Sequence, residues 1–327
     1  MLTEKTTSKL FLIDGSALAY RSHFAFLNNP LTNSKGETTS AVFGFTRSLL
    51  KILDEEKPNY IAVVFDTPQP TFRHKAYADY KATRQKMPED MASQLPRIKQ
   101  VIEAFRIPII EVPGYEADDV MGTLARKAEG ENLLTYLVTG DKDFMQLVTS
   151  RVKIYNPKRA GDEVEIVDEK KVKEKLGVPP QQVRDVLGLM GDTSDNVPGV
   201  PGIGPKTASQ LIQEFSSLEN VLENLDKVTK QKLRESLKQH ADSARLSKKL
   251  VTIDTAAPIE LDFEQLKLGH PDNQRLVELF KELEFNTLLG RFTTQDMKTG
   301  AHYEMVTTTK ALEELITHLK QAGSFTL

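Results

Sequence analysis

The chain has 327 residues, of which 39% are hydrophobic and 27% are charged, and its formal net charge is -3. This length is sufficient for two domains, and the composition is that of a globular protein. Cysteine is absent, which excludes disulfides, zinc–thiolate sites and thiol catalysis, so any metal ion must be bound by oxygen or imidazole. The net charge argues against a uniformly basic nucleic-acid-binding protein, but local basic patches have to be sought along the chain.

The N-terminal segment is not predicted to be a targeting signal. It contains Glu4, and Asp14 ends the apolar run that follows before it reaches the length of a signal-peptide core. No run of about 18 apolar residues occurs in the sequence. We therefore expect a cytoplasmic protein without a transmembrane helix.

Four apolar segments of strand length alternate with helix-like segments in the first part of the chain, at 9–14, 60–66, 107–112 and 133–141. They are apolar without alternation, which is typical of strands buried on both faces of a parallel sheet. Strands that alternate with helices predict a doubly wound, mostly parallel α/β domain, which we place at residues 1–180.

After Pro179 and Pro180 the pattern changes to helices, and we expect a helical module over residues 181–292. Within it, periodic apolar residues predict helices, and 252–262 is expected to be a connecting strand or loop. A tail with a further strand, a helix and the beginning of another strand is expected from residue 303. The helices are predicted at 181–191, 206–215, 217–225, 277–285 and 309–322.

Aspartates follow three of the predicted strands: Asp14, Asp66 and Asp141, with Asp143 two residues further on. The carboxyl ends of parallel strands meet at one edge of a sheet, where ligands bind, so these acids should converge there. The alternative for each aspartate is that it caps the following helix. Capping is a weaker explanation for all three together.

Two further acidic motifs add Glu116, Asp118 and Asp119 in YEADDV, and Asp192 and Asp195 in GDTSDN. Glu116 and Asp119 are expected to share a helical face, with Asp118 pointing elsewhere. Either motif alone is explained as well by acids that interact with the dipole of a helix N-terminus.

These nine carboxylates are too many to lie together in ionised form without cations, because like charges at short range raise one another's pKa values. Oxygen ligands without cysteine or histidine suit Mg²⁺ or Mn²⁺ better than Zn²⁺. Nine acids exceed the needs of one ion. The sequence therefore predicts a site for two or more metal ions, of the kind that activates water and stabilises a leaving oxygen in nucleases and polymerases.

The segment GVPGIGPKTA (199–208) places glycines immediately before a predicted helix. Gly202 and Gly204 permit close approach of a phosphate, and Lys206 and Thr207 lie in the first turn, where backbone N–H groups attract anions. The spacing is not that of a Walker loop. Its helical context predicts a helix-hairpin-helix that binds a DNA backbone, although a simple turn between helices is the alternative.

Two stretches are locally basic. Residues 71–86 contain Arg73, Lys81 and Arg84 with interleaved tyrosines including Tyr80, a combination that suits single-stranded nucleic acid. Lys81 and Arg84 are spaced so that one helical face would present both to a phosphate. Residues 227–250 are also basic, either as a solvated helix face or as an extension of a DNA-binding surface.

Five motifs in this order resemble the 5′-nuclease domain of bacterial DNA polymerase I, of Bacillus type, in the flap endonuclease superfamily. The resemblance covers residues 8 to about 290. The motifs are LIDGSALAYRSHFAF, VVFDTPQPTFRHKAYADYKATR, GYEADDV, VTGDKDFMQLV and GDTSDNVPGVPGIGPKTA.

The resemblance implies a monomeric, nucleoid-associated enzyme that cuts 5′ flaps and 5′ ends of DNA and removes RNA primers. All nine carboxylates match the family's acidic site. Lys81 and Arg84 match a catalytic basic pair on a helical arch, here at 71–100, and Arg21 matches a basic residue near the site. The hairpin matches a duplex-binding element that also holds K⁺ in relatives. Residues 293–327 would be a linker and the beginning of a 3′-5′ exonuclease-like domain, so no polymerase activity is expected.

Two other functions are alternatives to a nuclease. A non-catalytic helix-hairpin-helix DNA-binding module would leave the acids with structural roles. A phosphohydrolase of small molecules would leave the hairpin and the basic stretches without a role. Mg²⁺-dependent cleavage of a 5′-labelled flap distinguishes the first alternative from the nuclease.

Overall fold

A computed structural model of the chain describes residues 8–157, 164–292, 306 and 308–322. The chain forms two compact units, Met1–Asp272 and Asn273–Leu327. The second unit contains α13 (Asn273–Glu282) and α15 (Thr309–Ala322), which confirms the helices predicted there. The strand expected from residue 303 and the one expected at the C-terminus lie outside the described residues. No helix in the described part of the chain is long and apolar enough to cross a membrane.

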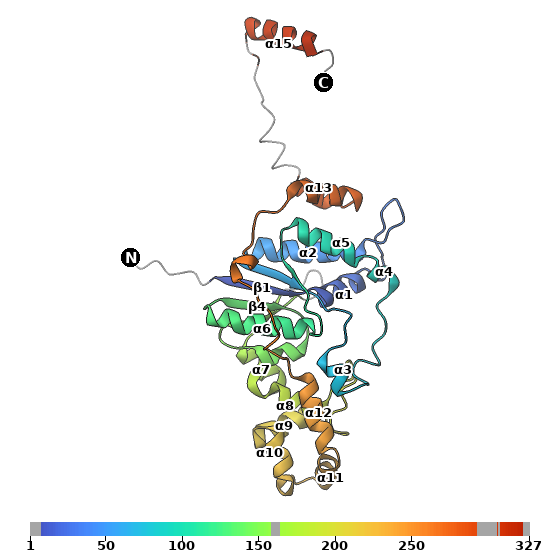
Figure 1. Cartoon of the computed structure of the whole chain (residues 1–327), viewed down its shortest axis with the longest axis vertical. Coiled ribbons are helices and arrows are strands. Elements are labelled where there is room, and N and C mark those ends of the chain that lie inside the picture. Colours follow the sequence, from blue (N-terminus) through green and yellow to red (C-terminus); the bar gives the residue numbers. More distant parts are fainter. Residues whose placement is uncertain (1–7, 158–163, 293–305, 307, 323–327) are drawn as a thin grey trace, which may run out of the picture. The chain divides into compact units, whose positions relative to one another are not determined.

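The first unit is built on a six-stranded sheet with the order β3-β2-β1-β4-β5-β6 (Figure 1). Neighbouring strands are parallel except β5 and β6, which confirms the predicted mostly parallel sheet. The weaker segment at 107–112 contributes only two residues. The strands are β1 (Lys9–Asp14), β2 (Tyr60–Val64), β3 (Ile109–Ile110), β4 (Leu134–Val138), β5 (Val152–Asn156) and β6 (Glu165–Val167).

Helices cover both faces of the sheet, as Figure 1 shows. The central strand β1 is buried on both sides, with Leu10, Phe11, Leu12 and Ile13 all inaccessible to solvent, which explains its unbroken apolar sequence. Leu10 and Leu12 belong to the core that also contains the apolar face of α6. The helices of this part are α1 (Gly15–Ala25), α2 (Ser40–Glu55), α5 (Leu95–Ala104), α6 (Ala117–Gly130) and α7 (Glu169–Leu176).

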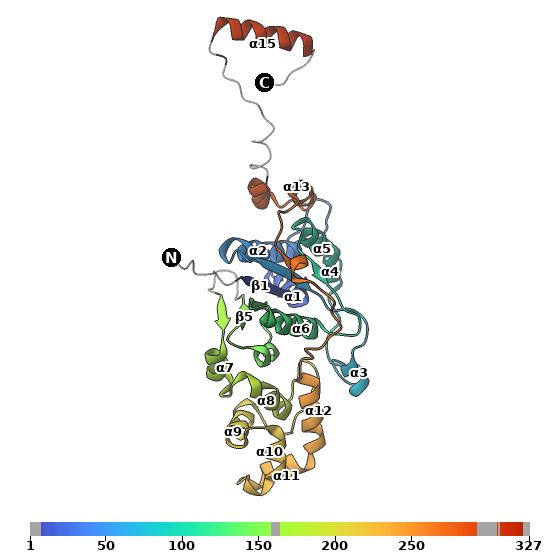
Figure 2. The same cartoon turned by 60° about the vertical axis from the view of Figure 1, so that its left-hand side comes forward.

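The predicted helical module follows η2 (Pro180–Gln182), and Figure 2 shows its helices gathered at one end of the first unit. Residues 191–204 form the hairpin between α8 and α9. Residues 252–262 form a loop, followed by η4 (Phe263–Leu266). The helices are α8 (Val183–Met190), α9 (Pro205–Phe215), α10 (Leu218–Glu223), η3 (Leu225–Lys227), α11 (Gln231–Gln239) and α12 (Ala241–Val251).

The expectation of one helical face carrying Lys81 and Arg84 is wrong. Between α3 (Phe72–Ala76) and α4 (Glu89–Ala92) the chain forms turns and extended backbone. Lys81 has φ of 58°, which an α-helix cannot contain, and its N–H donates to the Asp195 carbonyl at 2.9 Å. A tertiary hydrogen bond therefore replaces a helical one in this segment.

Candidate functional site

Four acids from different elements meet at the carboxyl edge of the sheet. Asp14 is the last residue of β1, Asp66 and Asp141 follow β2 and β4, and Asp118 lies in the first turn of α6. Asp66 accepts a hydrogen bond of 2.9 Å from the N–H of Ala117, which fixes the end of β2 against the start of α6. We call Asp14, Asp66, Asp118 and Asp141 the strand-end acid cluster.

The electrostatics of the strand-end acid cluster indicate uncompensated negative charge. Burial is the main cause that raises the pKa of Asp14 to about 7, and the neighbouring carboxylates of Asp66 and Asp141 contribute to this rise. Burial also raises the pKa of Asp118 well above its ordinary value, and Asp141, Asp14 and Asp66 contribute next. The four carboxylates are therefore close enough to repel one another, and a cation among them would relieve this repulsion.

The capping alternative holds for individual oxygens of the strand-end acids. Asp14 Oδ1 accepts from the N–H of Ala17 at 2.8 Å and caps α1, and Asp141 Oδ1 accepts from the N–H of Asp143 at 2.9 Å to cap η1 (Lys142–Leu147). Such a cap occupies one oxygen of each carboxylate, and the other Asp14 oxygen, Oδ2, accepts a longer hydrogen bond of 3.4 Å from Thr139 Oγ1. Capping and ligand binding are therefore compatible at these positions.

Asp143, Asp192 and Asp195 form a second acidic group beside Asp141. Burial raises the pKa of Asp143 strongly, and the charges of Asp141 and Asp192 add to it. Asp143 Oδ1 is buried and has no hydrogen-bond partner among the described residues. Lys142 Nζ lies 2.7 Å from Asp192 Oδ2, and this ion pair together with hydrogen bonds from Ser194 outweighs the effect of burial and lowers the pKa of Asp192. Asp192 is thus paired with Lys142 and Asp195 with Arg84, whereas Asp143 makes no ion pair within the described part of the chain.

The structure reverses the expected arrangement of YEADDV. Asp118, expected to point elsewhere, faces the strand-end acids, and Asp119 turns away from them. Because α6 begins at Ala117, Glu116 is its N-cap and Asp119 closes a capping box with the Glu116 backbone. The first turn of the helix therefore separates the two neighbouring aspartates.

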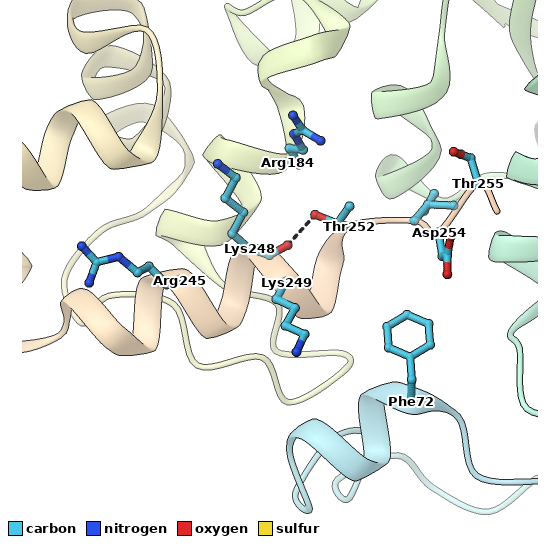
Figure 3. Close-up of a pocket in the computed structure, with 9 residues that line it drawn as sticks. Phe72, Arg184, Arg245, Lys248, Lys249, Thr252, Asp254 and Thr255 are labelled. Atoms are coloured by element: carbon cyan, nitrogen blue, oxygen red, sulfur yellow. Dashed lines mark hydrogen bonds between the residues drawn. The ribbon is translucent and has the colours of Figure 1, made fainter. Parts of the chain in front are cut away.

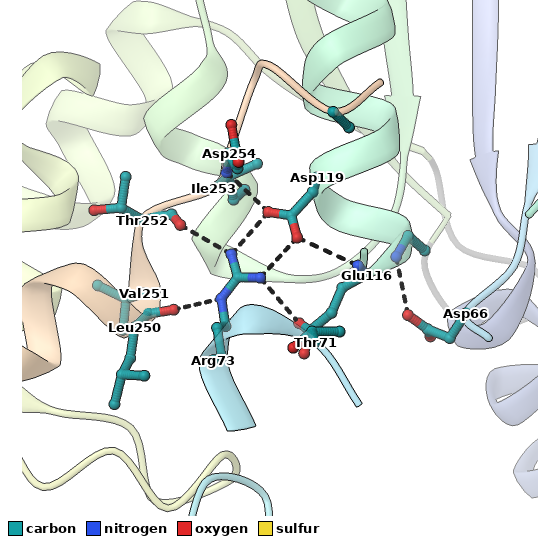
Figure 4. Close-up of polar contacts among 12 residues, drawn as sticks. Asp66, Thr71, Arg73, Glu116, Asp119, Leu250, Val251, Thr252, Ile253 and Asp254 are labelled. Atoms are coloured by element: carbon teal, nitrogen blue, oxygen red, sulfur yellow. Dashed lines mark hydrogen bonds and ion pairs between the residues drawn. The ribbon is translucent and has the colours of Figure 1, made fainter. Parts of the chain in front are cut away.

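Asp119 is held in a buried ion pair with Arg73, as Figure 4 shows. Arg73 Nη1 and Nη2 donate to the two Asp119 oxygens at 2.7 and 2.8 Å. Arg73 also donates to the carbonyls of Leu250 and Thr252 at the end of α12, and the N–H of Asp254 donates to Asp119. Both oxygens of Asp119 are engaged, so in this conformation the carboxylate binds the arginine rather than a metal ion.

The predicted role of Arg73 and Tyr80 in DNA binding is not compatible with their burial. Arg73 is 2% exposed and Tyr80 is 5% exposed, so neither side chain offers a surface to DNA. The hydroxyl of Tyr80 lies 3.2 Å from both Glu116 Oε2 and Asp195 Oδ2, and its one proton is available to either carboxylate. The sequence pattern of aromatic and basic residues did not distinguish these two inward-facing side chains from the outward-facing ones.

Lys81 and Arg84 contact acids rather than solvent alone. Lys81 Nζ lies 2.9 Å from Glu116 Oε2, and Arg84 Nε donates to Asp195 Oδ1 at 2.9 Å. The Lys81 side chain is 18% exposed and that of Arg84 is 50% exposed. Both cations therefore pair with acids of the predicted site, and Arg84 is the more exposed of the two.

The residues expected to bind duplex DNA lie at the start of α9. Gly202, Gly204 and Lys206 are exposed and Thr207 is partly exposed, so the first turn of this helix faces solvent. Gly202 has φ of 83°, which explains a glycine there, whereas Gly204 is the N-cap and has no atom within 4 Å of an added Cβ. This end of the helix lacks an acidic first turn and offers its N–H groups to an anion.

Arg21, on α1, is tied to the edge of the sheet. Its Nη2 donates to Asn156 Oδ1 at 3.3 Å and would lie 2.5 Å from a Cβ added at Gly140, between β4 and Asp141. Gly140 therefore leaves room for the guanidinium beside the acids. Sequence reasoning missed Lys142 and Asn156 in this region, because a lysine between two aspartates and an asparagine at a strand end are common on protein surfaces.

The fit of these residues to metal ions rests on their chemistry rather than on a formed coordination shell. As placed, no three acidic or histidine side chains in the described part of the chain are grouped closely enough to hold an ion. Lysine, arginine and backbone N–H groups engage several of the carboxylates instead. The oxygen-only donor set, the raised pKa values and the buried Asp143 oxygen without a partner all fit hard divalent cations.

Family models match the chain from residue 9 to residue 274. Residues 9–177 match the 5′-3′ exonuclease N-terminal resolvase-like domain, and residues 178–274 match the 5′-3′ exonuclease C-terminal SAM fold. The chain belongs to the 5′-3′ exonuclease family. This confirms the resemblance to the 5′ nucleases and the combination of a mostly parallel α/β domain with a helical module.

Two relatives with similar sequences support the assignment to the same family. A 5′-3′ exonuclease from Aquifex aeolicus is 42% identical over 280 residues, which is 86% of this chain and 93% of the relative. DNA polymerase I of Bacillus caldotenax is 42% identical over 312 residues, which is 94% of this chain and 35% of that protein. This exonuclease-family chain thus spans about a third of the length of the DNA polymerase I that it matches.

Solved structures share the fold at low sequence identity. A bacteriophage T5 D15 flap endonuclease variant, crystallised with DNA and metal ions, has a TM-score of 0.64 and 18% identity, covering 89% of this chain and 98% of that one. The catalytic core of Rad2, in complex with a DNA substrate, has a TM-score of 0.58 and 21% identity, covering 85% and 88%. At these identities the similarity shows a common fold.

Proposed function

We propose that this 5′-3′ exonuclease-family chain is a structure-specific 5′ nuclease. It hydrolyses phosphodiester bonds of 5′ flaps and 5′ ends of DNA, and of RNA primers on DNA, in replication and repair. The observation that carries this proposal is the strand-end acid cluster, in which burial and mutual repulsion raise the pKa values of Asp14 and Asp118. The division into a catalytic part, 1–180, and a helix-hairpin-helix module, 181–292, belongs to the same proposal.

The cofactor in this proposal is Mg²⁺ or Mn²⁺, in two or more ions. One set of metal ligands would be Asp14, Asp66, Asp118 and Asp141, and a second set would be Asp143, Asp192 and Asp195. Glu116 contacts Lys81 and lies beside the first set. When bound, such ions activate water and stabilise the leaving oxygen of the phosphodiester. Asp119 is the predicted ligand that fits least, because Arg73 engages both of its oxygens.

The chain's own cations have a separate role. In the proposed reaction, Lys81 and Arg84 leave Glu116 and Asp195 and contact the phosphates on either side of the bond that is cut. A positioned cation stabilises the negative charge that develops in the transition state, and it does so most strongly in a partly buried site. Arg21 contributes positive charge at the opposite side of the acids, where Asn156 positions its guanidinium.

The hairpin is proposed to bind the backbone of duplex DNA through the exposed start of α9 and, through its backbone carbonyls, a K⁺ ion. Duplex contacts at the hairpin and cleavage at the acids would be separate functions of the first unit. The T5 flap endonuclease and Rad2 structures contain DNA, which supports DNA as the partner here. We further propose a monomer that acts in the cytoplasm, associated with the nucleoid.

A cleavage assay tests the proposal. Asp14→Ala should abolish Mg²⁺-dependent cleavage of a 5′-labelled flap, because the cluster loses a central ligand while the hairpin is unchanged. Binding to the same flap in Ca²⁺ should persist. Asp242→Ala, which removes an exposed acid of α12, is the matched control and should cleave normally. Equal cleavage by wild type and Asp14→Ala, or by wild type with and without Mg²⁺, would refute the nuclease assignment.

A further inference from the structure

A pocket of about 550 Å³ lies in the first unit between α3, α8, α12 and the loop that follows α12 (Figure 3). Its lining combines an aromatic ring with several cations. Phe72 comes from α3, Arg184 from α8, and Arg245 and Lys249 from α12, while Asp254 is the acid in the lining. None of these side chains belongs to the acidic site or to the hairpin described above, and only the backbone N–H of Asp254 contacts that site, at Asp119.

The positive charge of this pocket is largely uncompensated. Arg184 and Lys249 are exposed and make no ion pair within the described part of the chain. Arg245 pairs at 3.2 Å with Asp242, whose side chain is fully exposed, and such surface pairs contribute little. The neighbouring Lys248, by contrast, is neutralised by Asp185 at 2.7 Å and Glu219 at 2.6 Å. Three weakly compensated cations around one pocket suit a ligand with more than one phosphate.

The aromatic ring restricts the choice among polyanions. Phe72 is partly buried, and its ring is fixed by Arg73, whose guanidinium carbon lies 4.5 Å from the ring centroid. A duplex backbone would contact the cations but leave this ring unused. Single strands, by contrast, are bound by cations along the backbone together with aromatic rings on which bases stack. Asp254 Oδ1 already accepts from the N–H of Ala256 at 2.8 Å, so the acid is anchored in its loop.

The pocket is connected to the candidate site through two neighbouring residues. Phe72 precedes Arg73, which holds Asp119 of α6, and the same segment continues to Lys81, which contacts Glu116. A strand that passes Lys81 would therefore find the pocket at the other end of the same segment. We propose that this pocket binds a single-stranded segment of the 5′ flap, distant from the bond that is cut. This inference rests on the proposed nuclease function.

Direct binding of a single strand tests the pocket without any cleavage. The probe is a fluorescein-labelled oligothymidylate of about twelve nucleotides, titrated in EDTA. Lys249→Ala and Arg184→Ala should each weaken binding several-fold and reduce the slope of log affinity against log salt by about 0.7 for each phosphate that is no longer neutralised. Lys173→Ala removes an exposed lysine of α7 outside the pocket and is the matched control. If both pocket variants bind the probe as tightly as the control, the inference is wrong.

The ring is tested separately, because removal of charge alone would not distinguish stacking from electrostatic attraction. Phe72→Leu keeps an apolar side chain next to Arg73 and should weaken probe binding about tenfold, because bases can no longer stack on the ring. An unchanged melting temperature shows that the Arg73 contacts persist. Thymidine monophosphate should compete poorly, since a strand uses several phosphates. Efficient competition by the mononucleotide would overturn the assignment to a strand.

Cleavage of flaps of two lengths separates failure of this inference from failure of the proposed function. On a flap of about one nucleotide, Lys249→Ala should cleave at the wild-type rate, whereas on a flap of about twelve its kcat/KM should fall several-fold. Equal losses on both flaps would show a general electrostatic effect and overturn the pocket assignment. If neither wild type nor any variant cleaves either flap, the proposed nuclease function is refuted. The oligothymidylate titration would still decide whether the pocket binds a single strand.

Discussion

Two sets of ion pairs connect the segment after β2 to the acids, and they differ in burial. Arg73 and Asp119 form a pair whose side chains are 3% and 0% exposed, and all three guanidinium nitrogens and both carboxylate oxygens are hydrogen-bonded. Lys81 contacts Glu116 at 2.9 Å and Asp195 at 3.8 Å, and Arg84 donates to Asp195 from two nitrogens, but these two side chains are 18% and 50% exposed. The buried pair fixes the segment to α6 and α12, whereas the exposed cations can exchange one anion for another.

The difference explains why similar residue types have different roles within twelve positions of the sequence. An arginine that makes two buried hydrogen bonds to a carboxylate separates from it only at a large cost in free energy, because each partner would remain as a buried charge. Lys81 and Arg84 are more exposed than Arg73, at 18% and 50%, so we expect them to exchange a carboxylate for a phosphate more readily than Arg73 would. The first arrangement is structural and the second is suited to transition-state binding.

The largest effect should follow from breaking the buried pair. Asp119→Ala leaves the Arg73 guanidinium without its carboxylate, and we expect a loss of about 3–5 kcal/mol in the free energy of unfolding. Chemical denaturation measures it. The double variant Arg73→Met/Asp119→Leu should recover much of this loss, because no charge remains buried. If Asp119→Ala is as stable as wild type, Asp119 is not a structural residue and its assignment as a metal ligand regains support.

The next largest effect is expected on the cleavage rate, with no change in stability. Lys81→Ala should lower the single-turnover cleavage rate at saturating enzyme by about a hundredfold, since one transition-state donor is removed. Its melting temperature should stay close to that of wild type. Lys86→Ala, an exposed lysine of the same segment, is the control and should cleave normally. A wild-type single-turnover rate for Lys81→Ala, with a smaller salt dependence of binding, would make Lys81 an electrostatic residue only.

The hairpin is proposed to make a third kind of contact, with duplex DNA, through its backbone rather than through side chains. Gly204→Val should weaken duplex binding by about two- to fivefold, because the added side chain stands where a phosphate approaches the start of α9. Nothing lies within 4 Å of a Cβ at this position, so stability should be unaffected. Gly202→Val should also strain the backbone, given its positive φ. Unchanged duplex affinity in Gly204→Val would remove the phosphate-binding role of the hairpin.

The smallest effect is expected for stability at the exposed pair. Arg84→Ala should change the free energy of unfolding by less than about 1 kcal/mol, because a half-exposed ion pair contributes little. Thermal denaturation in parallel with Asp119→Ala provides the comparison. A loss for Arg84→Ala as large as that for Asp119→Ala would mean that the two sets of ion pairs do not differ in kind.

Much of the fold follows from local sequence. Strands β1, β2 and β4 are apolar on both faces, so their burial in a parallel sheet could be predicted, and Asp14, Asp66 and Asp141 follow them at its carboxyl edge. The helices of the module could be predicted from their periodicity. The tail helix coincides with the predicted range at Thr309–Ala322.

Only the tertiary structure separated residues with the same local signature. Asp118 and Asp119 are adjacent acids, yet one faces the strand ends and the other faces Arg73, because the N-cap at Glu116 sets the rotation of α6. Arg73 and Tyr80 have the composition of a nucleic-acid-binding segment, yet carbonyls of Leu250 and Thr252 and the acid Glu116 draw them inward. Partners 36 to 179 residues away decide these roles, and no local pattern records contacts between residues so distant in sequence.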